Sequence, residues 1–197
     1  MKTTKVLETN INEITISEVS KTLNTSSKNR VAICNANTLV RSVKNIEIRN
    51  SINSFSIKTP DGFPVAKALS FLTKNKFKRV DGYKVFLQTI ADGLETNTSH
   101  YFFGNNEATT QQMIENLKNI FPDIKISGYI CPENLAAEEL ALKYKDKFAK
   151  IETDIVWVSL GFPKQELFIE KIYNEINPKT NFVGIGGVFD WVAGTKR

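Results

Sequence analysis

The clearest local structure in the sequence is predicted for Ile155-Val-Trp-Val-Ser-Leu-Gly-Phe-Pro-Lys-Gln-Glu-Leu-Phe-Ile-Glu-Lys171. Residues 155–160 are apolar, β-branched or aromatic apart from one serine, which is typical of a strand buried on both faces. Gly161 can turn the chain after that strand. Pro163 suits the first turn of a helix, because its missing N–H would have no partner there. The stretch therefore predicts a strand followed directly by a helix.

The helix of this stretch is expected to bury one side. Phe168, Ile172 and Ile176 recur at helical spacing, which gives an apolar stripe. The triplet Lys164-Gln165-Glu166 then lies in the first turn, outside the carboxyl end of a strand, where open α/β sheets bind ligands. In many proteins such a triplet is only a solvated helical turn, and the segment alone leaves both interpretations open.

Size and composition indicate one globular unit. The chain has 197 residues, of which 41% are hydrophobic, enough for one sizeable core in a single domain spanning residues 1–197. It contains no apolar run long enough to span a bilayer and no signal-peptide pattern at its start, so we expect a cytoplasmic protein. The formal net charge of +5 is compatible with anionic substrates, a membrane surface or nucleic acid.

Cysteine and histidine are scarce. Cys34 and Cys131 lie far apart and fit no disulfide or metal framework, which suits a reducing compartment. His100 is the single histidine, so a metal centre or a histidine-activated nucleophile has little to build on. We therefore expect no metal site and no cofactor.

Short apolar strands alternate with helical stripes from Val31 onward, which predicts a Rossmann-like α/β fold with a mainly parallel sheet flanked by helices. Residues 1–29 are expected to form a small strand–helix element, in which Thr15 and Glu18 have the spacing of a capping box. Strands are expected at 31–34, 55–58, 100–104, 124–130 and 155–160, and from 182 onward. One helix after the first of these strands is expected to carry Leu39, Val40, Val43 and Ile46.

Polar residues follow two of the predicted strands. Asn35, Asn37 and Thr38 come after the strand at 31–34, where their ordinary role is a turn and a helix cap. Asp61 lies in a Pro-Asp-Gly sequence that is a strong turn signal. Alternatively, its carboxylate lies at the same edge of the sheet as the 164–166 triplet, where it could act as a general base.

A basic segment, Lys74–Arg79, precedes the next helical pattern. Such clusters are usually solvated, although Arg79 offers a planar set of donors that matches phosphate oxygens. Together with residues 143–150, the segment also allows a module that binds nucleic acid or an anionic membrane. We disfavour that module because aromatic residues are not interleaved with the charges as stacking platforms require.

Two glycine-containing strand ends suggest a nucleotide. The strand that ends at Gly104, followed by Asn105, resembles the start of a nucleotide-binding half-domain. The run Gly184-Ile-Gly-Gly187 resembles a dinucleotide fingerprint, but its third glycine position holds Phe189. A close approach of this backbone to another ligand stays open, with Asp190 nearby.

Four motifs in order carry a resemblance that covers nearly the whole chain. They are Pro60-Asp-Gly62, Arg79-Val-Asp-Gly82, Leu160-Gly-Phe-Pro-Lys-Gln-Glu166 and Gly186-Gly-Val-Phe-Asp-x-x-Ala-Gly194. Each motif alone is weak, but the ordered set closely resembles the WecG/TagA/CpsF glycosyltransferases (glycosyltransferase family 26).

The resemblance implies an inverting enzyme that moves a sugar from a UDP-sugar to a polyprenyl-diphosphate-linked saccharide, in the synthesis of teichoic acids, capsules or enterobacterial common antigen. By the same resemblance, Asp61 is the general base, Gln165 is a polar pocket residue needed for activity, and Arg79 lies near the active site. The expected substrate-binding residues are Asn35, Asn37, Thr38, Gly104, Asn105, Lys164, Gly186, Gly187 and Asp190. Arg79 and Lys164 are candidates to stabilise the leaving diphosphate.

The chain departs from the family pattern in two places. The family commonly has a threonine two residues before the asparagine of its first loop, whereas Asn35 follows Ile33 and Cys34, so Thr38 would have to supply that hydroxyl. Family members also continue beyond the position of Arg197 into a basic, aromatic appendage linked to membrane docking and to the donor diphosphate. We therefore expect a truncated chain that binds donor poorly or turns over slowly.

The expected partners are a UDP-sugar, a polyprenyl-diphosphate-linked acceptor and, through the appendage, the cytoplasmic face of the cell membrane. We expect no nucleic acid partner, and an apolar patch in place of the appendage would favour a homo-oligomer. The transferred sugar is expected to be N-acetylmannosamine-like or another hexose. The alternative is a nucleotide-binding α/β protein without transferase activity, either a degenerate family member or a nicotinamide-dependent enzyme.

Overall fold

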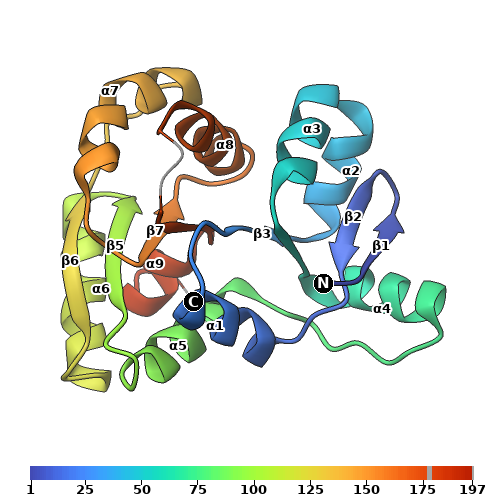
Figure 1. The fold of residues 1–197 in the computed structure, drawn as a ribbon, viewed down its shortest axis with the longest axis horizontal. Coiled ribbons are helices and arrows are strands. Elements are labelled where there is room, and N and C mark those ends of the chain that lie inside the picture. Colours follow the sequence, from blue (N-terminus) through green and yellow to red (C-terminus); the bar gives the residue numbers. More distant parts are fainter. Residues whose placement is uncertain (177–178, 197) are drawn as a thin grey trace.

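The computed structural model describes residues 1–176 and 179–196 and shows a parallel sheet between two layers of helices (Figure 1). The strands are β1 (Thr3–Val6), β2 (Thr9–Asn12), β3 (Arg30–Cys34), β4 (Ile57–Pro60), β5 (Ser99–Gly104), β6 (Lys125–Ile130), β7 (Ile155–Ser159) and β8 (Asn181–Gly184). The helices are α1 (Ile16–Thr25), α2 (Ala36–Lys44), α3 (Ile46–Ser54), α4 (Gly62–Thr73), α5 (Gly82–Gly93), α6 (Glu107–Ile120), α7 (Ala137–Lys150), α8 (Lys164–Ile176) and α9 (Val188–Ala193).

Six strands form the main sheet, in the order β4-β3-β8-β7-β5-β6. Every neighbouring pair in it is parallel. The predicted α/β fold with a mainly parallel sheet is therefore confirmed. Because the strands run the same way, their carboxyl ends all reach one edge of the sheet.

Strand β7 lies inside the sheet, and all five of its residues are buried, as its apolar sequence predicts. Its largest side chain, Trp157, packs against Phe86 of α5 at 4.8 Å between ring centroids. The Trp157 indole N–H donates to Nδ1 of His100 at 3.2 Å. Burial lowers the pKa of His100 to about 4, so the imidazole is neutral at pH 7 and serves packing.

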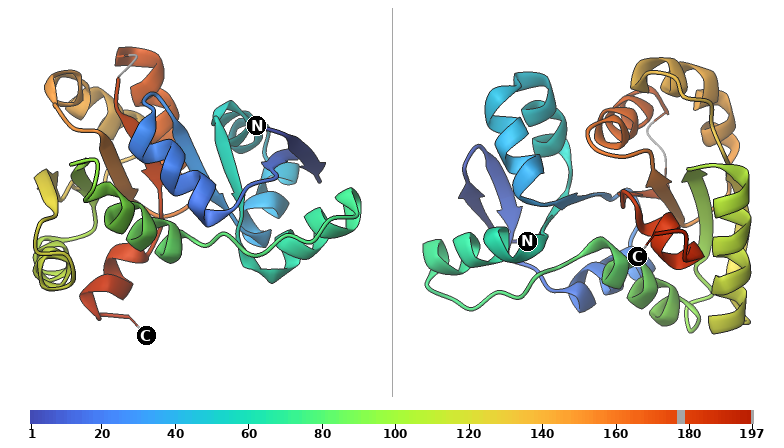
Figure 2. Two further views of the ribbon diagram at one scale, coloured as in Figure 1. Left: turned by 60° about the horizontal axis from the view of Figure 1, so that its bottom comes forward. Right: turned by 180° about the vertical axis from the view of Figure 1, so that it is seen from behind.

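The helices cover the two faces of the sheet (Figures 1 and 2). One hydrophobic cluster joins the sheet to α2, α3, α4, α7 and α8. The other joins it to α1, α5, α6 and α9. Within the two described ranges, none of the helices combines the length and the apolar character needed to cross a bilayer. With both faces covered, the edge at the carboxyl ends of the strands is where loops can surround a ligand.

The amino-terminal element is more elaborate than predicted, because a β1–β2 hairpin precedes α1. The predicted capping box is present: the Glu18 N–H donates to Oγ1 of Thr15 at 3.3 Å, and the Thr15 N–H donates to Oε2 of Glu18 at 2.8 Å. These reciprocal bonds satisfy donors that the first turn of a helix leaves open.

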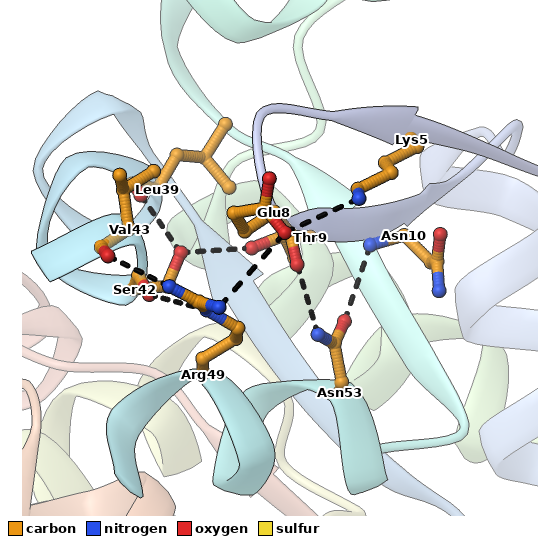
Figure 3. Close-up of polar contacts among 9 residues, drawn as sticks. All are labelled: Lys5, Glu8, Thr9, Asn10, Leu39, Ser42, Val43, Arg49 and Asn53. Atoms are coloured by element: carbon orange, nitrogen blue, oxygen red, sulfur yellow. Dashed lines mark hydrogen bonds and ion pairs between the residues drawn. The ribbon is translucent and has the colours of Figure 1, made fainter. Parts of the chain in front are cut away.

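Polar contacts attach the hairpin to α2 and α3 (Figure 3). The Asn53 side chain donates to the carbonyl of Glu8 at 2.9 Å and accepts from the N–H of Asn10 at 3.2 Å. The hydroxyl oxygens of Thr9 and Ser42, on β2 and α2, are joined by a hydrogen bond at 3.0 Å. The hairpin is therefore held against the layer that contains α2 and α3.

The single helix predicted through Ile46 is wrong, because the chain forms two helices there. The Asn45 side chain accepts the N–H of Ile48 at 3.1 Å and so caps a new helix. As a result Ile46 lies in the first turn of α3 and is 61% exposed. Two other boundaries also shift: the strand expected at 55–58 lies at Ile57–Pro60, and Pro163 lies one residue before α8.

Gly104 is required where β5 passes β7. Its φ of +132° favours glycine, and an added Cβ would lie 2.2 Å from the carbonyl oxygen of Ser159. Gly161 also has a positive φ, +76°, but nothing lies within 4 Å of an added Cβ there. Substituting alanine at these two positions therefore distinguishes the cost of backbone strain from the cost of a steric clash.

We predict that Gly104→Ala lowers the free energy of unfolding by about 3 kcal/mol or more, because two strands must move apart in addition to the backbone strain. Gly161→Ala, the control, should cost about 1–2 kcal/mol, the strain of a left-handed alanine alone. Urea unfolding measures both. Equal losses would show that the contact with β7 is not what restricts position 104.

Candidate active site

Two adjoining cavities lie at the carboxyl edge of the sheet. The first, of about 320 Å³, is lined by residues at the ends of β3, β4, β7 and β8 and in the loops after them. The second, of about 410 Å³, is lined by residues at or after the ends of β5, β6, β7 and β8. Gly186 and Gly187 line both. This edge is where parallel α/β sheets place ligands.

Most of the predicted site residues meet here. The first cavity is lined by Asn35, Thr38, Asp61, Arg79, Gln165, Gly186 and Gly187, among others. The second is lined by Asn105, Lys164, Gly186, Gly187 and Asp190, among others. Asn37 is exposed on α2 and Gly104 is buried in β5, and neither lines a cavity.

Asp61 lies at the junction of β4 and α4, where it caps the helix. Its Oδ1 accepts the N–H of Gly62 at 2.7 Å. Burial is the main cause that raises the pKa of Asp61, and the nearby Asp81 carboxylate adds to it, while the Gly62 N–H and Arg79 act in the opposite direction. The carboxylate is therefore more basic than that of an exposed aspartate, which suits a group that accepts a proton.

Arg79 is held beside Asp61 by the segment that leads into α5. The Val80 N–H donates to the Pro60 carbonyl at 3.0 Å, which ties this segment to the end of β4. Nη2 of Arg79 lies 3.2 Å from Oδ2 of Asp81, whose Oδ1 caps α5 by accepting the Lys84 N–H at 3.0 Å. Arg79 remains 55% exposed, so the pair contributes little to stability and chiefly sets the direction of the guanidinium.

Asn35 and Thr38 combine a structural role with a place in the cavity. Oδ1 of Asn35 accepts the N–H of Thr38 at 3.1 Å and its hydroxyl at 3.3 Å. The helix-cap interpretation is therefore confirmed. The same two residues line the first cavity, and the side-chain NH₂ group of Asn35 takes no part in either bond.

The solvated-turn interpretation of residues 164–166 is wrong for Gln165 and Glu166, which are 3% and 2% exposed. Oε1 of Gln165 accepts the N–H of Gly186 at 2.9 Å, and its Nε2 donates to Oε1 of Glu166 at 2.9 Å. An added Cβ on Gly184 would lie 3.0 Å from that Nε2, so the glycine lets the amide approach β8. Gln165 thus joins α8 to the turn after β8, and one N–H of its amide is left over for a ligand.

Glu166 is not among the expected substrate-binding or catalytic residues, although it belongs to the 164–166 triplet. It lines the first cavity, and its Oε2 has no hydrogen-bond partner among the residues that the structure describes. Burial raises the pKa of Glu166 to about 7, whereas the Gln165 amide and its own backbone act to lower it. The available signal was its spacing of three residues from Ile169, which places it on the buried side of the helix.

The second cavity contains cations suited to an anion. Nζ of Lys164 donates to Oδ1 of Asn134 at 2.7 Å, and Nζ of Lys196 lies 3.1 Å from Oδ2 of Asp190. Asn105, with a φ of +59°, forms the turn between β5 and α6. No group of three or more His, Cys, Asp or Glu side chains suited to a metal ion occurs within residues 1–176 and 179–196.

A family model described as "Glycosyl transferase WecG/TagA/CpsF family" matches residues 4–197. The chain belongs to this family. The resemblance carried by the four motifs is therefore confirmed, and it extends through the sheet and both cavities.

Two similar relatives have the name N-acetylglucosaminyldiphosphoundecaprenol N-acetyl-beta-D-mannosaminyltransferase. The protein from Bacillus spizizenii is 32% identical over 146 residues, which are 74% of this chain and 55% of that protein. The protein from Bacillus subtilis is 28% identical over 160 residues, which are 79% of this chain and 59% of that protein. The chain thus matches a little over half the length of these relatives.

We predict that Glu166→Gln removes a pH dependence of stability. A carboxyl group whose pKa rises from 4.5 to about 7 on folding holds its proton more tightly in the folded state. Its contribution to stability is therefore present below pH 4.5 and is lost as the pH rises to 7. Relative to the variant, the wild-type chain should lose about 3 kcal/mol between pH 4.5 and 7.5.

Urea unfolding at several pH values measures this difference. Glu175→Gln, at an exposed position on the same helix, controls for the loss of one carboxyl group. A difference between wild type and Glu166→Gln that does not vary with pH would show that folding does not raise the pKa of Glu166.

Proposed function

We propose that this chain forms the catalytic core of an inverting glycosyltransferase of bacterial cell-surface polysaccharide or teichoic acid synthesis. Its donor would be a UDP-sugar and its acceptor a polyprenyl-diphosphate-linked saccharide. The observation that carries the proposal is the meeting of Asp61, Arg79 and Gln165 in one cavity of a family member. The names of the two relatives favour N-acetylmannosamine as the sugar and N-acetylglucosaminyl-diphospho-undecaprenol as the acceptor.

In the proposed reaction, Asp61 takes the proton from the acceptor hydroxyl as its oxygen attacks the anomeric carbon. The UDP group leaves from the opposite face of the sugar, which inverts the configuration. The raised pKa of Asp61 supports this role, because a more basic carboxylate is a better proton acceptor as long as it is ionised at the working pH. Its backbone bond to Gly62 fixes the carboxylate at the wall of the cavity.

The leaving diphosphate needs donors that are already in place. Arg79 supplies an oriented guanidinium in the first cavity, and Lys164 supplies an ammonium group in the second. The positive ends of the helices that begin after Asp61 and Asp81 act in the same direction. We place the sugar in the first cavity and the uridine in the second, with the diphosphate beside Gly186 and Gly187.

The runner-up is a nucleotide-binding α/β protein without transferase activity.

Since the chain matches about half the length of its relatives, we propose that a chain of their full length adds positive charge for the diphosphate and a membrane-docking segment. On this proposal the 197-residue chain binds donor more weakly, or turns over more slowly, than the longer one.

We predict that UDP raises the thermal unfolding midpoint of the chain, because a ligand that binds only the folded state stabilises it. NAD should give no such rise, and DNA should act only at low salt. Differential scanning fluorimetry with each compound separates the candidates. Stabilisation by NAD but not by UDP would favour a nicotinamide-dependent enzyme and overturn the proposal.

We predict that Asp61→Asn, in a chain of the relatives' full length, keeps UDP binding and lowers transfer by about 10²–10⁴-fold, the usual contribution of a general base. Calorimetry with UDP and a transfer assay with UDP-N-acetylmannosamine measure the two effects. Asp123→Asn, at an exposed position, is the matched control. Transfer at the wild-type rate by Asp61→Asn would exclude Asp61 as the base.

A further inference from the structure

Helix α4 presents an aromatic and basic stripe to the surface. Phe63, Lys67 and Phe71 follow each other at four-residue spacing and lie on one side of the helix. Phe63 is 68% exposed and Phe71 is 84% exposed, and Nζ of Lys67 lies 4.6 Å from the centre of the Phe63 ring. The opposite side, with Val65 and Leu69, is buried in the core. The packing of α4 against the core therefore does not depend on the exposed rings of Phe63 and Phe71.

The segment that contains this stripe carries only positive charge. Between Gly62 and Val80 the chain has five basic residues and no acidic residue. They are Lys67, Lys74, Lys76, Lys78 and Arg79, and all are exposed. The proposed reaction uses only Arg79, so the lysines have no role in the site described above.

A groove of about 700 Å³ is lined by the segment that follows α4, together with residues 14–17. Buried or half-buried Ile14, Phe77 and Val80 form its apolar part. Lys76, Lys78, Arg79 and Lys84 also line it, and no acidic residue does. We call the stripe, Lys74 and the groove the α4 surface, and its charged side chains are all basic.

Two bulky aromatic rings exposed on one helix face are costly in water, and such patches mark interaction sites. Aromatic side chains with lysines around them suit the interface of an anionic bilayer, where rings enter the headgroup region and lysines approach lipid phosphates. A symmetric contact between two copies would bring the cations of both copies together, which disfavours a second copy of the chain as the occupant.

We propose that the α4 surface docks the chain on an anionic lipid bilayer. Figure 1 shows α4 at the end of the molecule opposite β6. Phe63 follows Asp61 and Gly62, which line the first cavity, so docking would hold that cavity close to the bilayer. The idea that docking helps a lipid-linked acceptor to reach the cavity rests on the proposed function. The binding of the α4 surface to lipid does not depend on that function.

Sedimentation of the 197-residue chain with vesicles tests the proposal. The chain should bind vesicles of equal phosphatidylglycerol and phosphatidylcholine much more tightly than vesicles of phosphatidylcholine alone. Lys67→Ala combined with Lys74→Ala should weaken binding by about 25-fold, since one lysine near an anionic surface contributes about fivefold. The matched control is Lys147→Ala combined with Lys150→Ala, which removes the same charge from exposed positions of α7 and should leave binding close to wild type.

Phe71→Ser tests the apolar part and should weaken vesicle binding by about tenfold at both low and high salt, because salt does not screen an apolar contact. Its control is Leu142→Ser on α7, because Leu142 is a large apolar residue that is 68% exposed and lies outside the α4 surface. Unchanged thermal midpoints show that the variants fold, and unchanged stabilisation by UDP separates failure of lipid binding from failure of the proposed function.

Three outcomes would overturn the proposal. The first is equal binding to both kinds of vesicle. The second is an equal loss of binding in each variant and its control. The third is a monomer–dimer equilibrium, seen by analytical ultracentrifugation, that Phe71→Ser abolishes without changing vesicle binding, which would assign the α4 surface to self-association.

Discussion

The buried amide of Gln165 holds together the elements from which both cavities are built. It accepts the Gly186 N–H from the turn after β8 and donates to Glu166, its neighbour on α8. Gly184 makes this possible, because a side chain there would press against the amide. Without the amide, a backbone N–H and a buried carboxyl oxygen would lose their partners, and each such group is costly to leave unpaired. The turn that separates the two cavities thus depends on one side chain.

The first cavity is formed by residues that also begin helices. Asn35 caps α2 and Asp61 caps α4, each just after a strand, and Asp81 caps α5 at the end of a segment that Val80 ties to the end of β4. Cap positions favour short oxygen-bearing side chains, since the first turn of a helix leaves N–H groups unpaired. In a parallel sheet these positions meet at one edge, so the demands of helix initiation and of a polar site coincide. Asn35 can therefore cap α2 and line the first cavity at the same time.

Local patterns predicted burial better than they predicted boundaries or neighbours. The apolar run of β7 and the Thr15–Glu18 capping box were both recognisable, because each depends on adjacent residues. The division between α2 and α3 was missed, although Asn45 is a good cap, since apolar residues continue at helical spacing across it. Glu166 was left out of the predicted site because its burial depends on contacts with segments distant in the sequence, such as β8.

The sequence was enough to predict the class of fold, the family and most of the residues that reach the cavities. It did so because strand and helix periodicity record which side of each element is buried, and because the four motifs keep their order along the chain. Only the tertiary structure decided the strand order β4-β3-β8-β7-β5-β6, which brings Asp61, Arg79 and Gln165 together. The tertiary structure was also needed to show that Glu166 lines the first cavity and Asn37 does not. It showed as well that Phe63 and Phe71 of α4 are exposed. Periodicity carries no information about which strands become neighbours, because that choice depends on packing between segments far apart in the chain.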